Sequence, residues 1–367
     1  MSTNSRIIND LGLNWTAARR DNYLNKVTTI YLPRLDLHKS NQYHPPPNKY
    51  IAGTPKAGAS WHAYWKATSI KRHEKHYGQR HDIVSFHNSY WRRIIQKDES
   101  IIIRDEVTRQ IVLILVSNIT DTCIDISRRR TFEREDDPGH LAHFGYTCGS
   151  WAHPQLQLAE PFPKLYSQAE KVAGKRLNNR SLGMAGLVWN MLRSRLPEEI
   201  ISDFNDTTTR YGLPRMDMMK GYDTSIAFTV KGEDVILSTG PASGLELPPL
   251  SGLVAFNYGR YTHNEVNCNN WVIGYTTHAP EDPKNGGNFY LAQYGVLVLA
   301  ASNTVFTWHP TDYHGTTLFE MKPALGDEIC AGVRVDGDFN IGFIFEMSKR
   351  LRTAPKKLAL GMPIQLA

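Results

Sequence analysis

Residues 257–318 begin with the run Asn257-Tyr258-Gly259-Arg260-Tyr261-Thr262-His263-Asn264-Glu265 and end with the run Trp308-His309-Pro310-Thr311-Asp312-Tyr313-His314-Gly315-Thr316-Thr317. Two strand-like runs and a glycine-rich turn separate these ends. The first run carries a histidine and a carboxylate two residues apart, and the second carries a lone histidine. Two imidazoles and one carboxylate can occupy one face of a metal ion and leave the opposite face open. The stretch therefore predicts a metal site within a strand-rich region.

The spacing of the three side chains suits a sheet. Residues i and i+2 of a strand point to the same face, so His263 and Glu265 can reach one ion. His314 lies 49 residues beyond Glu265, which leaves room for several strands to bring the chain back beside the first pair. We interpret His263, Glu265 and His314 as ligands of a mononuclear non-haem iron(II) ion. His309 and Asp312 form an alternative ligand set, although they more readily shape the site.

The surrounding pattern predicts an α+β fold. Residues 164–212 show helical spacing, with a helix start at Pro197 that has acidic residues in its first turn. Short strand-like runs with Gly, Pro and Asn turns follow Ser225. These runs occupy residues 226–230, 254–256, 271–275, 289–291, 295–299, 305–308, 329–335 and 339–345. Helices followed by strands predict a helical layer packed against a jelly roll.

The first 160 residues read as an N-terminal extension of mixed structure, followed by a domain over 161–351 and a basic tail over 352–367. Two β-branched runs within 100–116 flank a polar turn and predict a β-hairpin. Residues 53–59 are rich in Gly and Pro, so we expect no helix there. Residues 137–163 lack periodicity and read as a connector.

Composition sets the broad class. Hydrophobic residues make up 41% of the 367 positions and charged residues 21%, which is typical of a globular chain. The sequence contains no run of about 18 apolar residues that would predict a membrane span. No apolar signal-peptide segment stands at its start, so we expect an intracellular protein. The four cysteines are widely spaced without a Cys-x-x-Cys pair, which predicts free thiols.

A basic, aromatic segment suggests a polyanionic partner. The formal net charge is +6, and residues 61–93 interleave aromatic and basic side chains. Bases stack on aromatic faces while cations follow phosphates, so this segment could contact nucleic acid. The alternative is that the aromatic residues anchor a small core and the cations form its solvated face. The members are Trp61, Tyr64, Trp65, Tyr77, Tyr90 and Trp91, with Lys66, Lys71, Arg72, Lys75, Arg80, Arg92 and Arg93.

The run from His263 to Asn270 resembles the His-x-Asp-x-x-Asn-type signature of the TET/J-binding-protein family of iron(II)/2-oxoglutarate dioxygenases. Residues 294–296, 305–308 and 314–317 resemble the fungal, mushroom-type members of that family. The resemblance covers about residues 182–350. It implies a double-stranded β-helix core, with His263, Glu265 and His314 as iron ligands. Glu265 departs from the family's aspartate by one methylene group.

The resemblance also implies an arginine for the remote carboxylate of 2-oxoglutarate, because a guanidinium group pairs with a carboxylate in a bidentate manner. No arginine occurs between His314 and Arg334. Arg334, on an apolar run, is the first candidate, and Arg260 is the second. Asn267, Asn269, Asn270 and Tyr313 are candidates to line a base pocket.

The family's activity implies that oxygen and 2-oxoglutarate are used to oxidise methylated bases, 5-methylcytosine or N6-methyladenine, in duplex DNA. A nuclear location would follow from that substrate. Two alternatives stay open: the same chemistry on a protein or small-molecule substrate, and a metal-dead nucleic-acid-binding relative.

Overall fold

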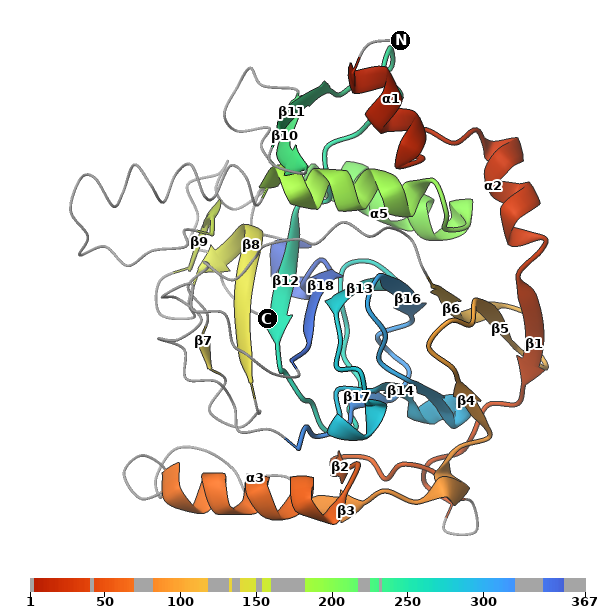
Figure 1. The fold of residues 1–367 in the computed structure, drawn as a ribbon, viewed down its shortest axis with the longest axis vertical. Helices are drawn as coiled ribbons and strands as arrows, with labels where there is room; N and C mark the ends of the chain where they lie inside the picture. The colour runs from red at the N-terminus through yellow and green to blue at the C-terminus, as the bar shows by residue number, and fades with distance from the viewer. Residues whose placement is uncertain are drawn as a thin grey trace.

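A computed structural model describes most of the chain in ten segments, which are residues 3–39, 43–68, 82–117, 132–133, 139–149, 154–159, 182–216, 225–230, 233–320 and 339–352. The architecture is mixed α+β and is dominated by one large sheet. Figure 1 shows helices α5 (Glu198–Tyr211) and α3 (Pro55–Thr68) on opposite sides of the large sheet, above and below it in the view.

The large sheet joins strands from both halves of the chain. Within the described residues it has ten strands, in the order β1-β5-β6-β16-β13-β18-β12-β8-β7, with β9 pairing β8. Their bounds are β1 (Thr28–Leu32), β5 (Ile101–Asp105), β6 (Ile111–Val116), β7 (Phe132–Glu133), β8 (His140–Gly149), β9 (Pro154–Leu158), β12 (Ser251–Phe256), β13 (Val272–His278), β16 (Thr304–Trp308) and β18 (Ile341–Phe345). The β1–β5 pair is parallel, and its neighbours along the path are antiparallel.

A smaller sheet carries the end of the 257–318 stretch. Its order in the described chain is β17-β14-β15-β4, with bounds β17 (His314–Thr316), β14 (Phe289–Leu291), β15 (Val296–Val298) and β4 (Arg93–Ile95). Two further strand pairs are β10 (Ser225–Val230) with β11 (Glu233–Ser238) and β2 (Tyr50–Ala52) with β3 (Ile83–Ser85).

The described helices are α1 (Thr3–Asp10), α2 (Ala17–Leu24), α3 (Pro55–Thr68), a helix over residues 182–193 and α5 (Glu198–Tyr211). Single 3-10 turns are η2 (Asn88–Tyr90), η4 (Pro283–Asn285), η5 (Ala292–Tyr294) and η6 (Lys349–Arg352). Helix α5 begins after Pro197 with Glu198 and Glu199 in its first turn and ends at the left-handed Gly212. That end is a common one, because glycine adopts positive φ without steric cost.

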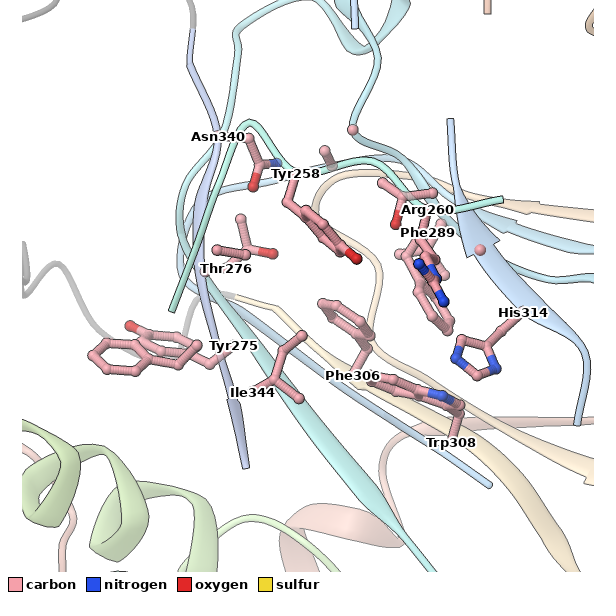
Figure 2. A pocket seen from close by; sticks show the side chains of 18 of the residues that line it. Tyr258, Arg260, Tyr275, Thr276, Phe289, Phe306, Trp308, His314, Asn340 and Ile344 are labelled. Atoms are coloured by element: carbon pink, nitrogen blue, oxygen red, sulfur yellow. The ribbon is translucent and has the colours of Figure 1, made fainter. Parts of the chain in front are cut away.

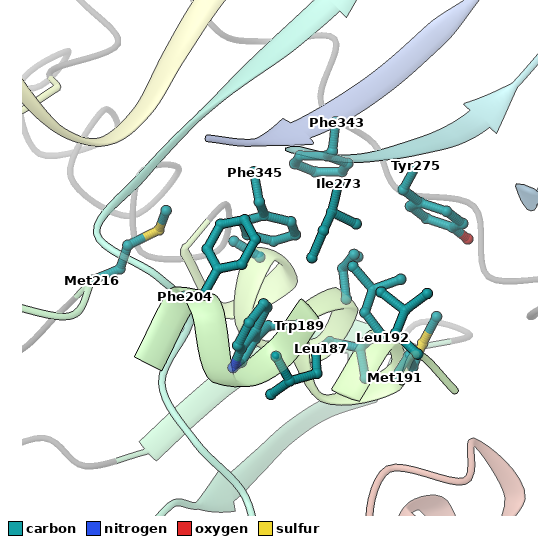
Figure 3. Close-up of a cluster of buried hydrophobic side chains, with 14 of the residues drawn as sticks. Leu187, Trp189, Met191, Leu192, Phe204, Met216, Ile273, Tyr275, Phe343 and Phe345 are labelled. Atoms are coloured by element: carbon teal, nitrogen blue, oxygen red, sulfur yellow. The ribbon is translucent and has the colours of Figure 1, made fainter. Parts of the chain in front are cut away.

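Both faces of the large sheet are buried, by different layers. On one face, Trp189 and Phe204 from the two adjacent helices pack against Ile273, Phe343 and Phe345 of the sheet (Figure 3). On the other face, apolar residues of β5, β6 and β13 pack against strands β14 and β15 of the smaller sheet. Strand residues alternate between the faces. A sheet covered on both sides therefore needs continuous apolar runs such as residues 111–116.

Several expectations are confirmed. The predicted hairpin is β5–β6, with antiparallel register from Ile101↔Leu115 onward. The helix start at Pro197 is correct. Strands coincide with the predicted runs at 226–230, 254–256, 271–275, 289–291, 295–299, 305–308 and 339–345, with boundaries that agree to within three residues. The predicted strand at 329–335 and residues 164–181 of the helical region lie outside the described part of the chain.

Two expectations were wrong. Residues 137–163 contain β8, which pairs with β12 over Ser251↔Gly145 to Phe256↔His140, so this region is not a connector. Helix α3 begins at Pro55, inside the segment expected to exclude a helix. Proline is tolerated in the first turn because that turn's N–H groups need no helical partner. The Thr54 hydroxyl accepts a hydrogen bond from the Ala57 N–H at 3.1 Å and caps the helix.

The N-terminal 160 residues share sheets with the domain expected over 161–351. Strand β6 pairs β16, β8 pairs β12 and β4 pairs β15. Trp61 and Trp91 of the basic, aromatic segment are buried, and the Trp61 indole donates to the Phe319 carbonyl at 2.8 Å. These two rings act as core anchors. Residues 69–81 of that segment lie outside the described residues.

Two further expectations concern membranes and thiols. None of the described helices combines the length and the apolar character needed to cross a bilayer. Cys148 and Cys268 are free thiols, while Cys123 and Cys330 lie outside the described residues.

Asp203 of α5 fixes the helical layer to the loop before β13. Its carboxylate accepts hydrogen bonds from the Asn270 N–H (2.7 Å), the Asn270 amide (2.8 Å) and the Trp271 N–H (3.0 Å). We expect Asp203→Ala to lower the free energy of unfolding by about 1–3 kcal/mol, because three donors, among them the N–H of the buried Trp271, lose their acceptor. Urea denaturation measures this loss.

The matched control is Asp206→Ala, which removes an exposed carboxylate from the same helix. Equal stability losses in the two variants would contradict a specific role for Asp203.

Candidate metal centre

A pair of backbone hydrogen bonds holds the two histidines of the predicted triad side by side. The His263 N–H donates to the His314 carbonyl, and the His314 N–H donates to the His263 carbonyl, each at 2.8 Å. The pair is an isolated antiparallel bridge between the loop after β12 and the start of β17. The ring centroids are 4.4 Å apart as a result.

Each imidazole is held in one tautomer by a carbonyl two residues earlier in the chain. Nδ1 of His263 is 2.8 Å from the Tyr261 oxygen, and Nδ1 of His314 is 2.8 Å from the Asp312 oxygen. A carbonyl oxygen only accepts, so each Nδ1 carries the hydrogen and the lone pair of a neutral ring lies on Nε2. Such an Nδ1–H to carbonyl contact is typical of metal-binding histidines.

Glu265 completes the cluster. Its backbone N–H donates to the Pro310 carbonyl at 2.9 Å, which ties it to the segment leading into His314. One ligand atom from each of His263, Glu265 and His314 lies within 4.8 Å of the other two. The two nitrogen donors and one oxygen donor could hold a divalent transition-metal ion while leaving part of its coordination sphere open.

His314 is the most deeply placed member, with 4% of its surface exposed. Burial lowers its pKa below the ordinary value of 6.5, although the Glu265 carboxylate acts in the opposite direction. The neutral ring is the form that binds a metal. The next position needs a glycine, because a Cβ at Gly315 would lie 2.4 Å from the Tyr290 hydroxyl and 3.0 Å from the Arg260 carbonyl.

The triad lies at one end of a cavity of about 140 Å³ whose lining comes from both sheets. Figure 2 shows Arg260, Phe289 and Trp308 around His314, with Tyr258 and Asn340 toward the other end. The Trp308 and Phe289 ring centroids are 5.4 Å and 6.1 Å from that of His314. These aromatic walls make the cavity largely apolar next to a polar cluster, as is common in ligand sites.

Arg260 brings a positive charge into the same cavity. Its guanidinium group stacks over the Tyr261 ring at 4.4 Å and donates to the Tyr261 hydroxyl at 3.3 Å. It is close enough to His314 to contribute to the lowering of that group's pKa. Arg260 is thus the predicted anion-binding arginine that the structure brings to the triad. Arg334, the other candidate, lies outside the described residues.

The alternative ligand set is engaged elsewhere. Nδ1 and Nε2 of His309 lie 3.0 Å from the Asn270 oxygen and 3.2 Å from the Ile111 oxygen, and its ring packs on Trp271 with centroids 3.8 Å apart. The Asp312 carboxylate forms an ion pair with Arg34 at 2.7 Å. Both residues therefore shape the loop that leads to His314.

The predicted base-pocket residues do not line the cavity within the described chain. The Asn269 amide donates to the Trp271 carbonyl, and its oxygen accepts from the Met347 N–H at 3.1 Å. Asn270 is held by Asp203. The Asn267 backbone bridges to Ser348, and Tyr313 accepts from the Gln293 N–H at 3.2 Å through its carbonyl.

Sequence reasoning missed two parts of the site. Phe289 and Trp308 were assigned only to strands, and the alternation of β14 and β16 could have placed them on the cavity face. The Arg34–Asp312 ion pair had no signal, because nothing in the isolated chain relates the two positions.

No protein-family model matches the chain, and no curated protein sequence matches it. One similar solved structure is NgTET1 in complex with 5mC DNA, with a TM-score of 0.40 and 10% identity, covering 73% of this chain and 89% of that one. Another is OsALKBH1, with a TM-score of 0.30 and 11% identity, covering 64% and 96%. Both TM-scores lie below 0.5, so neither likeness assigns this chain's fold or function.

The lowered pKa of His314 has a consequence for stability. Between its folded pKa and 6.5, the unfolded chain binds this proton more readily than the folded chain does. We therefore expect the metal-free protein to lose stability as the pH falls below 6.5, with His314 contributing up to about 1.4 kcal/mol per pH unit. Urea denaturation of wild type and His314→Asn between pH 7.5 and 5.5, with chelator present, should show a shallower slope in the variant.

The control variant is His38→Asn, which removes an exposed imidazole. A slope change of the same size in both variants would refute the contribution assigned to His314.

Proposed function

We propose that the protein is an iron(II)/2-oxoglutarate-dependent dioxygenase that oxidises methyl groups on DNA bases. The observation that carries the proposal is the convergence of His263, Glu265 and His314 at the end of a cavity that also contains Arg260. Two imidazoles and one carboxylate with open positions are the donor set typical of non-haem iron(II) oxygenases. The tautomers set by the Tyr261 and Asp312 carbonyls are those that this role requires.

Each residue has a defined task in this proposal. Bound iron(II) supplies the activation of oxygen that couples the oxidative decarboxylation of 2-oxoglutarate, to succinate and carbon dioxide, to hydroxylation of a substrate C–H bond. His263 and His314 donate through Nε2, and Glu265 donates through a carboxylate oxygen. Arg260 pairs with the remote carboxylate of 2-oxoglutarate. Phe289 and Trp308 limit the access of water beside the metal, which strengthens these electrostatic contacts.

The substrate assignment rests on the resemblance of the 263–270 run and on the chain's basic charge. The cavity holds little more than a small molecule, so a duplex cannot enter, and the target base would have to leave the stack. Asn269 and Asn270 use their amides within the fold, and Asn267 and Tyr313 also lie outside the cavity lining, so the proposal gives none of the four a contact with the base inside the cavity. A DNA substrate would place the protein in the nucleus.

The double-stranded β-helix core is part of the same proposal. The cavity is lined by β12, β13, β16 and β18 of the large sheet and by β14, β15 and β17 of the smaller one. Two facing sheets that enclose a ligand site at the end of a strand are what a jelly roll provides.

The first test measures turnover. Protein, iron(II), 2-oxoglutarate and duplex DNA containing 5-methylcytosine or N6-methyladenine should yield succinate together with an oxidised base. His263→Ala should lower both products by at least about 100-fold, because metal ligation is lost. Replacing iron(II) with zinc should abolish both, since zinc has no redox chemistry.

The outcomes separate the alternatives. Succinate without base oxidation would favour a protein or small-molecule substrate for the same chemistry. If no succinate forms and His263→Ala binds DNA as wild type does, the chain is a metal-independent nucleic-acid-binding relative. Binding to DNA should weaken steeply as salt rises, because contacts to phosphates release counterions.

The second test concerns Arg260. We expect Arg260→Ala to raise the KM for 2-oxoglutarate by about 10–100-fold, because the remote carboxylate loses a charge-assisted partner worth about 1.5–3 kcal/mol. Arg260→Lys should recover part of this loss. Steady-state kinetics with varied 2-oxoglutarate measure both effects.

Arg109→Ala is the matched control, since Arg109 also stacks over a tyrosine (Tyr31, 4.5 Å) but does not line the cavity. If Arg260→Ala leaves the KM for 2-oxoglutarate at the wild-type value, another cation fills this role.

A further inference from the structure

An ion pair links the N-terminal part of the chain to the loop that carries His314. Arg34 lies in the segment after β1, and its Nη2 is 2.7 Å from Oδ1 of Asp312. The two partners differ in their surroundings, because the Arg34 side chain is 52% exposed and that of Asp312 only 4%. Among the described residues, Arg34 is the cation paired with this buried carboxylate.

Asp312 also contacts the metal-site histidine through its backbone. Its carbonyl accepts the Nδ1–H of His314 at 2.8 Å, and its N–H donates to the His309 carbonyl at 3.0 Å. One residue thus carries the ion pair on its side chain and the tautomer-setting contact on its main chain. A shift of Asp312 therefore moves the oxygen that orients the His314 ring.

A second set of contacts fixes the position of Arg34. Its Nη1 lies 3.4 Å from the Tyr294 hydroxyl, and that hydroxyl donates to Oδ2 of the buried Asp105 at 3.0 Å. The next residue, Leu35, donates its N–H to the Gln293 carbonyl at 2.8 Å. The guanidinium position is consequently set by β5 of the large sheet and by the turn that joins β14 to β15 of the smaller sheet.

Replacing Arg34 would disturb the buried Asp312 more than the exposed site of Arg34 itself. A buried carboxylate deprived of its partner is unfavourable, so the loop that carries Asp312 relaxes toward solvent. This relaxation displaces the main chain at Asp312. Because the Asp312 carbonyl orients His314, the effect reaches the metal site without any change to a ligand.

We propose that Arg34 is a positioning residue of the metal centre, which holds the His314 imidazole in its ligating orientation through Asp312. The proposal rests on the metal-binding role of the triad given under the proposed function. Arg34 is neither one of the proposed ligands nor a residue of the cavity lining. The consequence is that affinity for the metal depends on a segment far from the ligands in sequence.

The test uses cobalt(II) as the probe, because its visible absorption reports coordination geometry and its binding can be titrated without turnover. We expect Arg34→Ala to raise the Kd for cobalt(II) by about 10–100-fold, as is usual for partners that orient a ligand. Its absorption spectrum should also change in shape. Arg34→Lys should recover part of the affinity, since lysine keeps the charge but loses the planar fork.

Lys39→Ala is the matched control. Lys39 lies in the same segment and pairs with Asp36 at 3.6 Å, not with Asp312. It should bind cobalt(II) with the wild-type Kd and spectrum. Tyr294→Phe removes only the hydroxyl behind Arg34 and should raise the Kd by a few-fold. If Arg34→Ala does not fold, the Kd values of Tyr294→Phe and Arg34→Lys for cobalt(II) provide the test.

The outcomes are distinct. Wild-type affinity and spectrum in Arg34→Ala, or unchanged affinity in both Arg34→Lys and Tyr294→Phe, would overturn the positioning role while leaving the metal centre intact. Failure of the wild-type protein to bind cobalt(II) at all would overturn the proposed function, and this inference with it. A raised Kd in Lys39→Ala equal to that in Arg34→Ala would assign the effect to the segment's general stability.

Discussion

The reciprocal backbone hydrogen bonds between His263 and His314 are the constraint on which the candidate site depends. They fix two positions that are far apart in sequence at the spacing of neighbouring strands. These main-chain contacts fix the two backbone positions, and the Nδ1 contacts with the Tyr261 and Asp312 carbonyls then orient the rings. Glu265 follows two residues after His263 and is tied to Pro310 by its own N–H. The three donors thus inherit their arrangement from the backbone.

The N-terminal part of the chain supplies the frame around that constraint. The Thr262 N–H donates to the Lys49 carbonyl at 2.9 Å, and the Asn48 N–H donates to the Thr262 carbonyl at 2.7 Å. Strand β6 supports β16, which carries Trp308 at its end. Residues within 1–160, which were expected to form an extension, therefore support the segments that carry His263 and Trp308. A cut after residue 160 would remove pairing partners from both sheets, because β4 and β8 also belong to them.

The sequence predicted those features that depend on local pattern. Continuous apolar runs gave the strands and the β5–β6 hairpin, because a sheet buried on both faces needs them. Strand β8 was missed because His140, His143 and Gly145 interrupt its alternation, and pairing with β12 overrides this weak local preference. The triad was predicted from the residue types, their spacing and the resemblance of the 263–270 run. The Arg34–Asp312 contact could not be predicted, because it exists only after two segments that are distant in sequence have come together in the fold.

The geometry of the site separates into a local and a non-local part, which explains why sequence reasoning reached one and not the other. Each imidazole is held by the carbonyl two residues before it, Tyr261 for His263 and Asp312 for His314. This motif sets the tautomer within a three-residue segment. The distance between the rings and the position of Asp312 need contacts across the fold. A site that depends on both parts is therefore sensitive to changes such as the loss of Arg34. Such a change replaces no ligand, but it shifts Asp312, whose carbonyl orients the His314 ring.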